Sequence, residues 1–76
     1  MIGEKLKKLR EDINLRQYEL AELIGISQKN ISAIEKRDDI YLSSLKKYVE
    51  ALGGNLKIYV EFNKKEILYD FSRSVK

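Results

Sequence analysis

Apolar residues recur every three or four positions over residues 1–54, which is the spacing of one face of an α-helix. Leu6, Leu9 and Ile13 follow this spacing, so we predict a first helix over residues 3–13 with these side chains buried. Three further helices are predicted, and their inward-facing residues are Leu20, Ala21 and Ile24, then Ile31 and Ile34, then Leu45, Val49 and Leu52.

Residues that favour helix ends separate these segments. Three polar residues are expected to cap the second, third and fourth helices: Asn14, with Gln17 three positions later as in a capping box, then Ser27 and Ser43. Gly25 is expected to end the second helix at residue 24, because glycine readily adopts the left-handed conformation. The third helix should reach about residue 36, and two glycines at 53–54 should end the fourth.

The period changes to two beyond residue 54. Apolar positions 56, 58, 60 and 62 alternate with 57, 59 and 61, which predicts a half-buried strand over residues 55–62. A turn at 63–65 and a second alternation over 66–71 complete a predicted β-hairpin. A lone two-stranded hairpin is marginal in water, so it must lie on a helix or pair with strands of another chain. The sequence leaves both arrangements open.

The composition narrows the possible chemistry. A chain of 76 residues is expected to form one domain of marginal stability. It has no cysteine and no histidine, so neither a disulfide nor the usual metal ligands and general base are available. We therefore expect no enzyme activity, no cofactor and no metal site. No apolar run or signal peptide indicates a membrane, and a cytoplasmic location is expected. The net charge of +3 is compatible with a polyanionic partner but does not establish one.

The tight break between the second and third helices is typical of a helix-turn-helix. A small residue is needed where two steeply crossing helices approach, and Ala21 supplies it. Gly25 allows the turn, while the branched side chains of Ile31 and Ile34 can hold the third helix from its inner side.

The run Gln17–Glu35 resembles the helix-turn-helix of phage repressor/Cro proteins and of the wider Xre group, which share this small–glycine–branched spacing. The resemblance covers about residues 3–53 and implies a mainly α, lambda-repressor-like domain of four to five helices with a C-terminal strand or hairpin. It also implies an ion pair between Arg10 and Glu35, which orients the third helix if it is buried and contributes little if it is exposed.

The continuation from Leu42 to Val60 is similar to a narrower subset, the HigA-type and HipB-like antitoxins. That resemblance implies a homodimer whose C-terminal strands pair across the two-fold axis, and repression of its own operon, often beside a toxin gene. The expected dimerisation residues are Leu56, Ile58, Val60 and Phe62. The chain would then divide into a DNA-binding domain at 1–54, a dimerisation hairpin at 55–71 and a tail at 72–76.

The aromatic residues have a structural interpretation and a binding one. Those of the hairpin are assigned to the core of a dimer sheet in preference to a ligand cage or base stacking: Tyr59, Phe62, Tyr69 and Phe71. Those of the helices are assigned to helix packing or to the surface: Tyr18, Tyr41 and Tyr48.

Residues at the start of the third helix are the candidates for reading DNA. Such a helix enters the major groove with its N-terminal side chains at the base edges. The expected base contacts are Gln28, Lys29, Ser32 and Ala33, and the expected phosphate contacts are Arg16, Gln17, Asn30, Lys36 and Arg37. Arg16 departs from the group, which more often has Thr or Ser there. These side chains could instead be ordinary solvated surface, and Gln17 could serve only in the cap.

Two classes of function remain. The favoured one is a dimeric, sequence-specific regulator, of antitoxin type, that binds an inverted repeat in double-stranded DNA with half-sites about 10 bp apart. The alternatives are an interaction module that neutralises a toxin with little DNA binding, and a phage-type repressor with no toxin partner.

Overall fold

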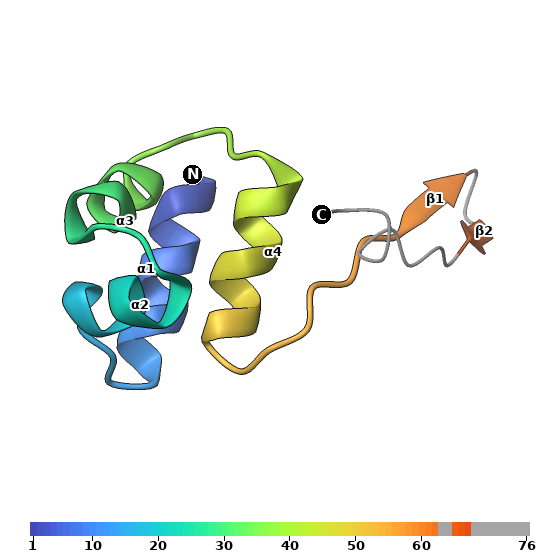
Figure 1. The fold of residues 1–76 in the computed structure, drawn as a ribbon. Helices are drawn as coiled ribbons and strands as arrows, with labels where there is room; N and C mark the ends of the chain where they lie inside the picture. Colours follow the sequence, from blue (N-terminus) through green and yellow to red (C-terminus); the bar gives the residue numbers. More distant parts are fainter. Residues whose placement is uncertain (63–64, 68–76) are drawn as a thin grey trace.

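Four helices are followed by a short antiparallel strand pair (Figure 1). The structure is a computed structural model that describes residues 1–62 and 65–67, with side chains up to residue 60. The helices are α1 (Ile2–Asp12), α2 (Gln17–Ile24), α3 (Gln28–Glu35) and α4 (Leu42–Ala51). Each predicted helix is therefore confirmed, with its ends shifted by one or two residues.

The core lies where the four helices meet. Its fully buried members are Leu6, Leu20, Ala21, Ile31 and Tyr48. Partly buried apolar residues surround them: Ile24, Ile26, Ile34, Ile40, Leu45, Val49, Ala51 and Leu52. The inward faces predicted for the second, third and fourth helices are thus confirmed, and Tyr48 belongs to helix packing, not to the surface.

The predicted buried face of the first helix is partly wrong. Leu6 is buried, but Leu9 is 50% and Ile13 48% exposed. The stripe that α1 buries consists of Gly3, Leu6 and Arg10. A glycine and an arginine therefore join Leu6 in the buried stripe, in place of the predicted Leu9 and Ile13.

Gly3 allows α1 to touch the end of α3. A Cβ at this position would lie 2.6 Å from the backbone carbon and oxygen of Glu35, which is closer than real contacts allow. The amide of Gly3 donates a hydrogen bond to the carbonyl of Arg37 at 3.0 Å. This contact fixes the first helix against the C-terminal end of the third.

The turn between α2 and α3 is built as predicted. Gly25 has φ 85°, in the left-handed region, and its amide donates to the carbonyl of Ala21 at 2.8 Å. The side-chain oxygen of Ser27 accepts a hydrogen bond from the amide of Asn30 at 3.2 Å, which caps α3.

Two of the predicted caps are wrong. Asn14 adopts a left-handed conformation (φ 61°) between α1 and α2, and the residue at the N-cap of α2 is Arg16. There the carboxylate of Glu19 accepts the Arg16 amide hydrogen at 2.9 Å, so the capping group comes from inside the helix. Ser43 lies within α4, whose N-cap residue is Tyr41 and has no side-chain cap bond.

The C-terminal strands are shorter than expected. Gly53, at φ 90°, ends the turn after α4, and residues 54–59 run on without strand pairing. β1 (Val60–Phe62) pairs antiparallel with β2 (Lys65–Ile67), with Val60 opposite Ile67. The strand predicted over 55–62 is thus wrong for 55–59. Lys65 belongs to β2 and not to the turn. The remainder of the second predicted strand, with Tyr69 and Phe71, and the tail at 72–76 lie outside the described residues. Figure 1 shows β1 and β2 standing apart from the helices.

Candidate nucleic-acid interface

The exposed face of α3 presents an open hollow to solvent along the length of the helix. It is lined by Gln17, Gln28, Lys29, Ser32, Ala33 and Lys36. All four predicted base contacts lie in it, together with two of the predicted phosphate contacts. Ser32 is half-exposed, and Gln28, Lys29 and Ala33 are exposed. None of the lining residues is acidic, so the hollow can approach a polyanion without repulsion from its own walls.

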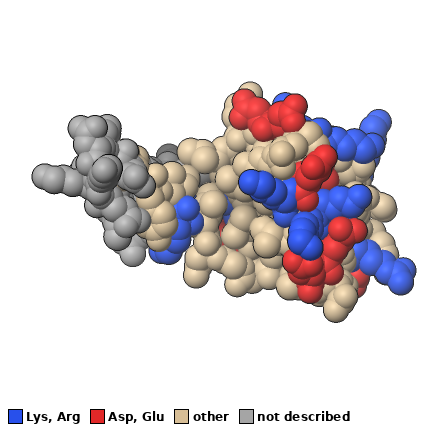
Figure 2. All heavy atoms as spheres, turned by 180° about the vertical axis from the view of Figure 1, so that it is seen from behind, with Lys and Arg blue, Asp and Glu red and all other residues tan. Residues whose placement is uncertain are grey.

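Charge does not single out one surface on the face that Figure 2 draws. The helical part of that face shows basic and acidic side chains interspersed, without a large area of one sign. The candidate interface is defined by the residues that line the hollow.

A second hollow adjoins the first at the start of α2. Gln17 and Gln28 line both, and Arg16, Asn14 and Tyr18 are among the other residues of the second. The predicted phosphate contacts Arg16 and Gln17 thus lie beside the start of α3, and Lys36 lies at its C-terminal end.

Two predicted phosphate contacts lie outside these hollows. The side chain of Asn30 is exposed, and the backbone amide of Asn30 donates to the capping oxygen of Ser27. Arg37 lines a separate hollow with Asp39, Ile40 and Tyr41.

A buried ion pair supports α3 from below. Nε of Arg10 lies 2.7 Å and Nη2 3.1 Å from the two carboxylate oxygens of Glu35. Arg10 is only 6% and Glu35 4% exposed, so the ion pair expected from the resemblance is present in its buried form. Arg10 also donates to the carbonyl of Leu15 at 2.7 Å, which ties the α1–α2 connection to the same guanidinium.

The carboxylate of Glu35 is held in its ionised state. Burial raises its pKa, but the hydrogen bonds from Arg10, Tyr48 and Gln17, with the charge of Arg10, outweigh burial, so the pKa lies below its ordinary value. The hydrogen bond to Glu35 stabilises the charged form of Arg10, and the pKa of Arg10 is therefore raised. Both groups are therefore charged at neutral pH.

Tyr48 is a member of this cluster that the sequence did not reveal. Its hydroxyl donates to Oε2 of Glu35 at 2.5 Å, and the carbonyl oxygen of Leu6 lies 3.1 Å from the same hydroxyl. Burial and the neighbouring carboxylate raise its pKa, so the phenol stays protonated. The signal was available, because position 48 lies on the apolar face defined by Leu45, Val49 and Leu52, where a buried tyrosine needs a hydrogen-bond partner.

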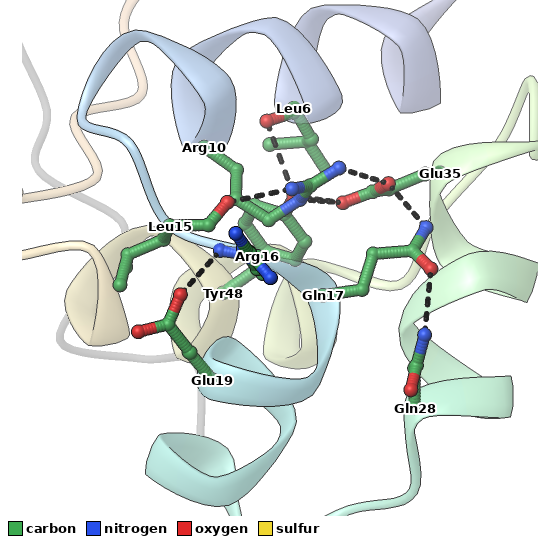
Figure 3. Close-up of polar contacts among 9 residues, drawn as sticks. All are labelled: Leu6, Arg10, Leu15, Arg16, Gln17, Glu19, Gln28, Glu35 and Tyr48. Atoms are coloured by element: carbon green, nitrogen blue, oxygen red, sulfur yellow. Dashed lines mark hydrogen bonds and ion pairs between the residues drawn. The ribbon is translucent and has the colours of Figure 1, made fainter.

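Gln17 connects the buried cluster to the surface of α3 (Figure 3). Its Nε2 donates to Oε1 of Glu35 at 2.9 Å. Its Oε1 accepts a hydrogen bond from Nε2 of Gln28 at 3.5 Å, a long contact between two amides. A chain of polar contacts therefore runs from the Arg10–Glu35 pair to a predicted base contact.

The fold agrees with the comparison against known families. Residues 6–58 match the family described as helix-turn-helix. The chain belongs to the helix-turn-helix family. Within that family, the predicted likeness to the Xre group and to HigA-type antitoxins is confirmed by the relatives.

Two relatives come from Mycobacterium tuberculosis (strain ATCC 25618 / H37Rv). HigA3, named as an antitoxin, is 34% identical over 70 residues, which are 88% of this chain. HigA2, named likewise, is 41% identical over 58 residues, or 74% of this chain. The matches span 64% and 57% of the length of these relatives, so both are longer than the helix-turn-helix chain described here.

Two solved structures share the fold. One concerns DNA bending induced by unique dimerization of a HigA antitoxin, with 36% identity, a TM-score of 0.75, and coverage of 84% of this chain and 88% of that one. The other is DNA-bound antitoxin HigA3, with 35% identity, a TM-score of 0.76, and coverage of 83% and 85%.

Among the side chains that the structure describes, those of residues 1–60, there is no group of three or more acidic, cysteine or histidine residues that could hold a metal ion. None of the four helices is long and apolar enough to cross a membrane.

Proposed function

We propose that this chain is a homodimeric, sequence-specific DNA-binding regulator of the HigA antitoxin type, which represses its own operon. The hollow that gathers Gln17, Gln28, Lys29, Ser32, Ala33 and Lys36 along α3 carries the proposal. The likeness of the chain to a DNA-bound HigA3 supports the choice of DNA as the partner.

The amide of Gln28 is arranged for an adenine. One hydrogen of its Nε2 points to Gln17, which leaves the second hydrogen and Oε1 free of side-chain partners in the described structure. An adenine offers N7 as acceptor and N6 as donor in the major groove, and this pair matches the free amide groups. Lys29 can reach the acceptors of a guanine, while Ser32 and the methyl group of Ala33 lie one helical turn further along.

Contacts to the DNA backbone would fix the register. The N-terminus of α2, which begins at Gln17, carries amide hydrogens without helical partners, and these attract phosphate. We assign the same role to the exposed side chains of Arg16, Asn30, Lys36 and Arg37. Backbone contacts position the protein without reading the sequence.

The C-terminal segment is the proposed dimerisation element. Leu56, Ile58 and Val60 are half-buried, and β1 and β2 form a sheet of two strands that is too small to be stable by itself. Pairing across a two-fold axis, with Phe62 included, would complete it and would place two copies of α3 on an inverted repeat. The domain at 1–54 would then bind DNA and the hairpin at 55–71 would join the subunits, while 72–76 forms a tail.

A toxin protein is the second partner in this proposal. Both M. tuberculosis relatives are named as antitoxins, which favours a toxin-binding role in addition to DNA binding over a repressor that acts alone.

Replacing Lys29 or Lys36 with alanine is expected to change DNA binding in two different ways. Lys29→Ala should change the preferred base at one position of each half-site, with a loss of about 1–3 kcal/mol in discrimination. Lys36→Ala should weaken all DNA sequences alike and reduce the slope of log affinity against log salt by about one unit. Binding assays on a set of single-base operator variants at several salt concentrations measure both effects. Identical salt-slope changes for the two variants would show that the assigned roles are wrong.

A further inference from the structure

The carboxylate of Glu35 receives four donors from three other helices. Oε2 accepts from Nε of Arg10 at 2.7 Å and from the hydroxyl of Tyr48 at 2.5 Å. Oε1 accepts from Nη2 of Arg10 at 3.1 Å and from Nε2 of Gln17 at 2.9 Å. Arg10 belongs to α1, Gln17 to α2 and Tyr48 to α4, so every other helix of the domain contacts this residue of α3.

Tyr48 is the donor of this set with the least freedom to move. Its side chain is fully buried in the core, and its hydroxyl also lies 3.1 Å from the carbonyl oxygen of Leu6 in α1. Gln17, by comparison, is only partly buried, and its contact with Gln28 is exposed. The hydroxyl of Tyr48 is therefore held in place, and its hydrogen bond can fix the orientation of the Glu35 carboxylate.

We propose that Tyr48 is a positioning residue for base recognition, which acts through Glu35 and Gln17 on the amide of Gln28. This inference rests on the proposed function, because it concerns how the same surface reads DNA. Arg10 binds both oxygens of the carboxylate from α1, and the Tyr48 hydroxyl adds a donor from α4 at Oε2. With the donors of both helices in place, the position of Oε1 is defined, and so is the position of the Gln17 amide that donates to it. Oε1 of Gln17 in turn sets which hydrogen of Gln28 remains for a base.

The variant Tyr48→Phe separates positioning from packing. It keeps the ring that fills the core and the Arg10–Glu35 pair, and it removes only the hydroxyl. We expect the preference for the best base at the Gln28 position to fall at least threefold, while affinity for random duplex DNA stays within twofold of the unmodified chain. In a Gln28→Ala background the same change should have no further effect on base preference, because the amide through which it acts is absent.

A matched control removes stability without touching the polar chain. Leu45 lies on the same helix as Tyr48 and packs against the core as a partly buried apolar side chain. Leu45→Ala should lower the melting temperature and leave base preference unchanged. If Leu45→Ala altered the preference as much as Tyr48→Phe, the role of Tyr48 would be general packing, and the proposal would be overturned.

A readout without DNA keeps this inference distinct from the proposed function. The side-chain amide signals of Gln17 and Gln28 in ¹H–¹⁵N spectra of the free protein should shift in Tyr48→Phe and stay in place in Leu45→Ala. Absence of any sequence preference in the unmodified chain would contradict the proposed function, and the amide signals would still decide whether Tyr48 positions the two glutamines. If the unmodified chain shows a preference that Tyr48→Phe retains, the inference is overturned, whatever the amide signals do.

Discussion

Arg10→Met is expected to lower the free energy of unfolding by about 3–5 kcal/mol at neutral pH, because it leaves the carboxylate of Glu35 buried without its cationic partner. A loss of this size is comparable with the whole stability of many small domains. Urea unfolding followed by circular dichroism measures it. The control is Lys8→Met on the same helix: Lys8 pairs with Asp12 at 3.6 Å on the surface, and losing such a pair costs less than about 1 kcal/mol.

The pH dependence of this loss has a definite sign. In the unmodified chain the pKa of Glu35 is lowered, so its contribution to stability is present at neutral pH and is lost as the pH falls through that lowered value. In Arg10→Met the burial that raises the pKa remains, while the strongest opposing hydrogen bond is gone. The folded variant should then take up a proton more readily than the unfolded chain, and its deficit should narrow as the pH is lowered from 7 towards about 5. A deficit that is small, or that widens on acidification, would mean that the pair does not hold Glu35 ionised.

Ile58→Lys is expected to convert the proposed dimer to monomers and to lower affinity for a two-half-site operator by at least about 100-fold, since joined binding modules gain this much from their linkage. Ile58 is half-buried in the segment that leads from α4 to β1, and a lysine there would place a charge in the proposed subunit contact.

Asn55→Lys provides the matched control for Ile58→Lys. Asn55 lies in the same segment, is exposed and is not one of the proposed dimerisation residues, so the same substitution there should leave the proposed dimer and its operator affinity largely intact. Light scattering and gel-shift assays measure the two properties. A dimer that survives Ile58→Lys would place the subunit contact elsewhere on the molecule.

The helix-turn-helix was predictable because its requirements are local. Ala21, Gly25 and Ser27 act within a few residues of their own position, and each does in the structure what its residue type allows. The residues that line the hollow on α3 followed from the same pattern, since their place on the helix depends only on spacing.

The errors arose where distant residues decide the outcome. Hydropathy alone cannot place Arg10 in the buried stripe of α1, because the partner that makes its burial tolerable, Glu35, lies 25 residues away. Because hydropathy favours an apolar residue over Arg10 in a buried position, the pattern predicts that Leu9 faces inward, whereas it is 50% exposed. Asn14 illustrates a second difficulty, since asparagine favours both helix caps and the left-handed conformation that it adopts here.

The alternation over residues 55–59 was a third source of error. Alternating residues allow a strand, but strand pairing needs a partner at the right place, and of residues 55–62 only 60–62 have one in the described chain. The alternation predicts that this segment of the chain is extended, but it does not predict at which residue the hydrogen-bonded strand pairing begins.

The central claim is that the exposed face at the start of α3 binds DNA, and an NMR titration tests it most directly. Duplex DNA from the promoter of the chain's own operon is added at low salt while the amide signals are followed. The expected result is that shifts concentrate at residues 28–33 and at Gln17, and weaken as salt is added. Signals of residues 28–33 that stay unmoved at low salt, with promoter and with random duplexes alike, would contradict the claim.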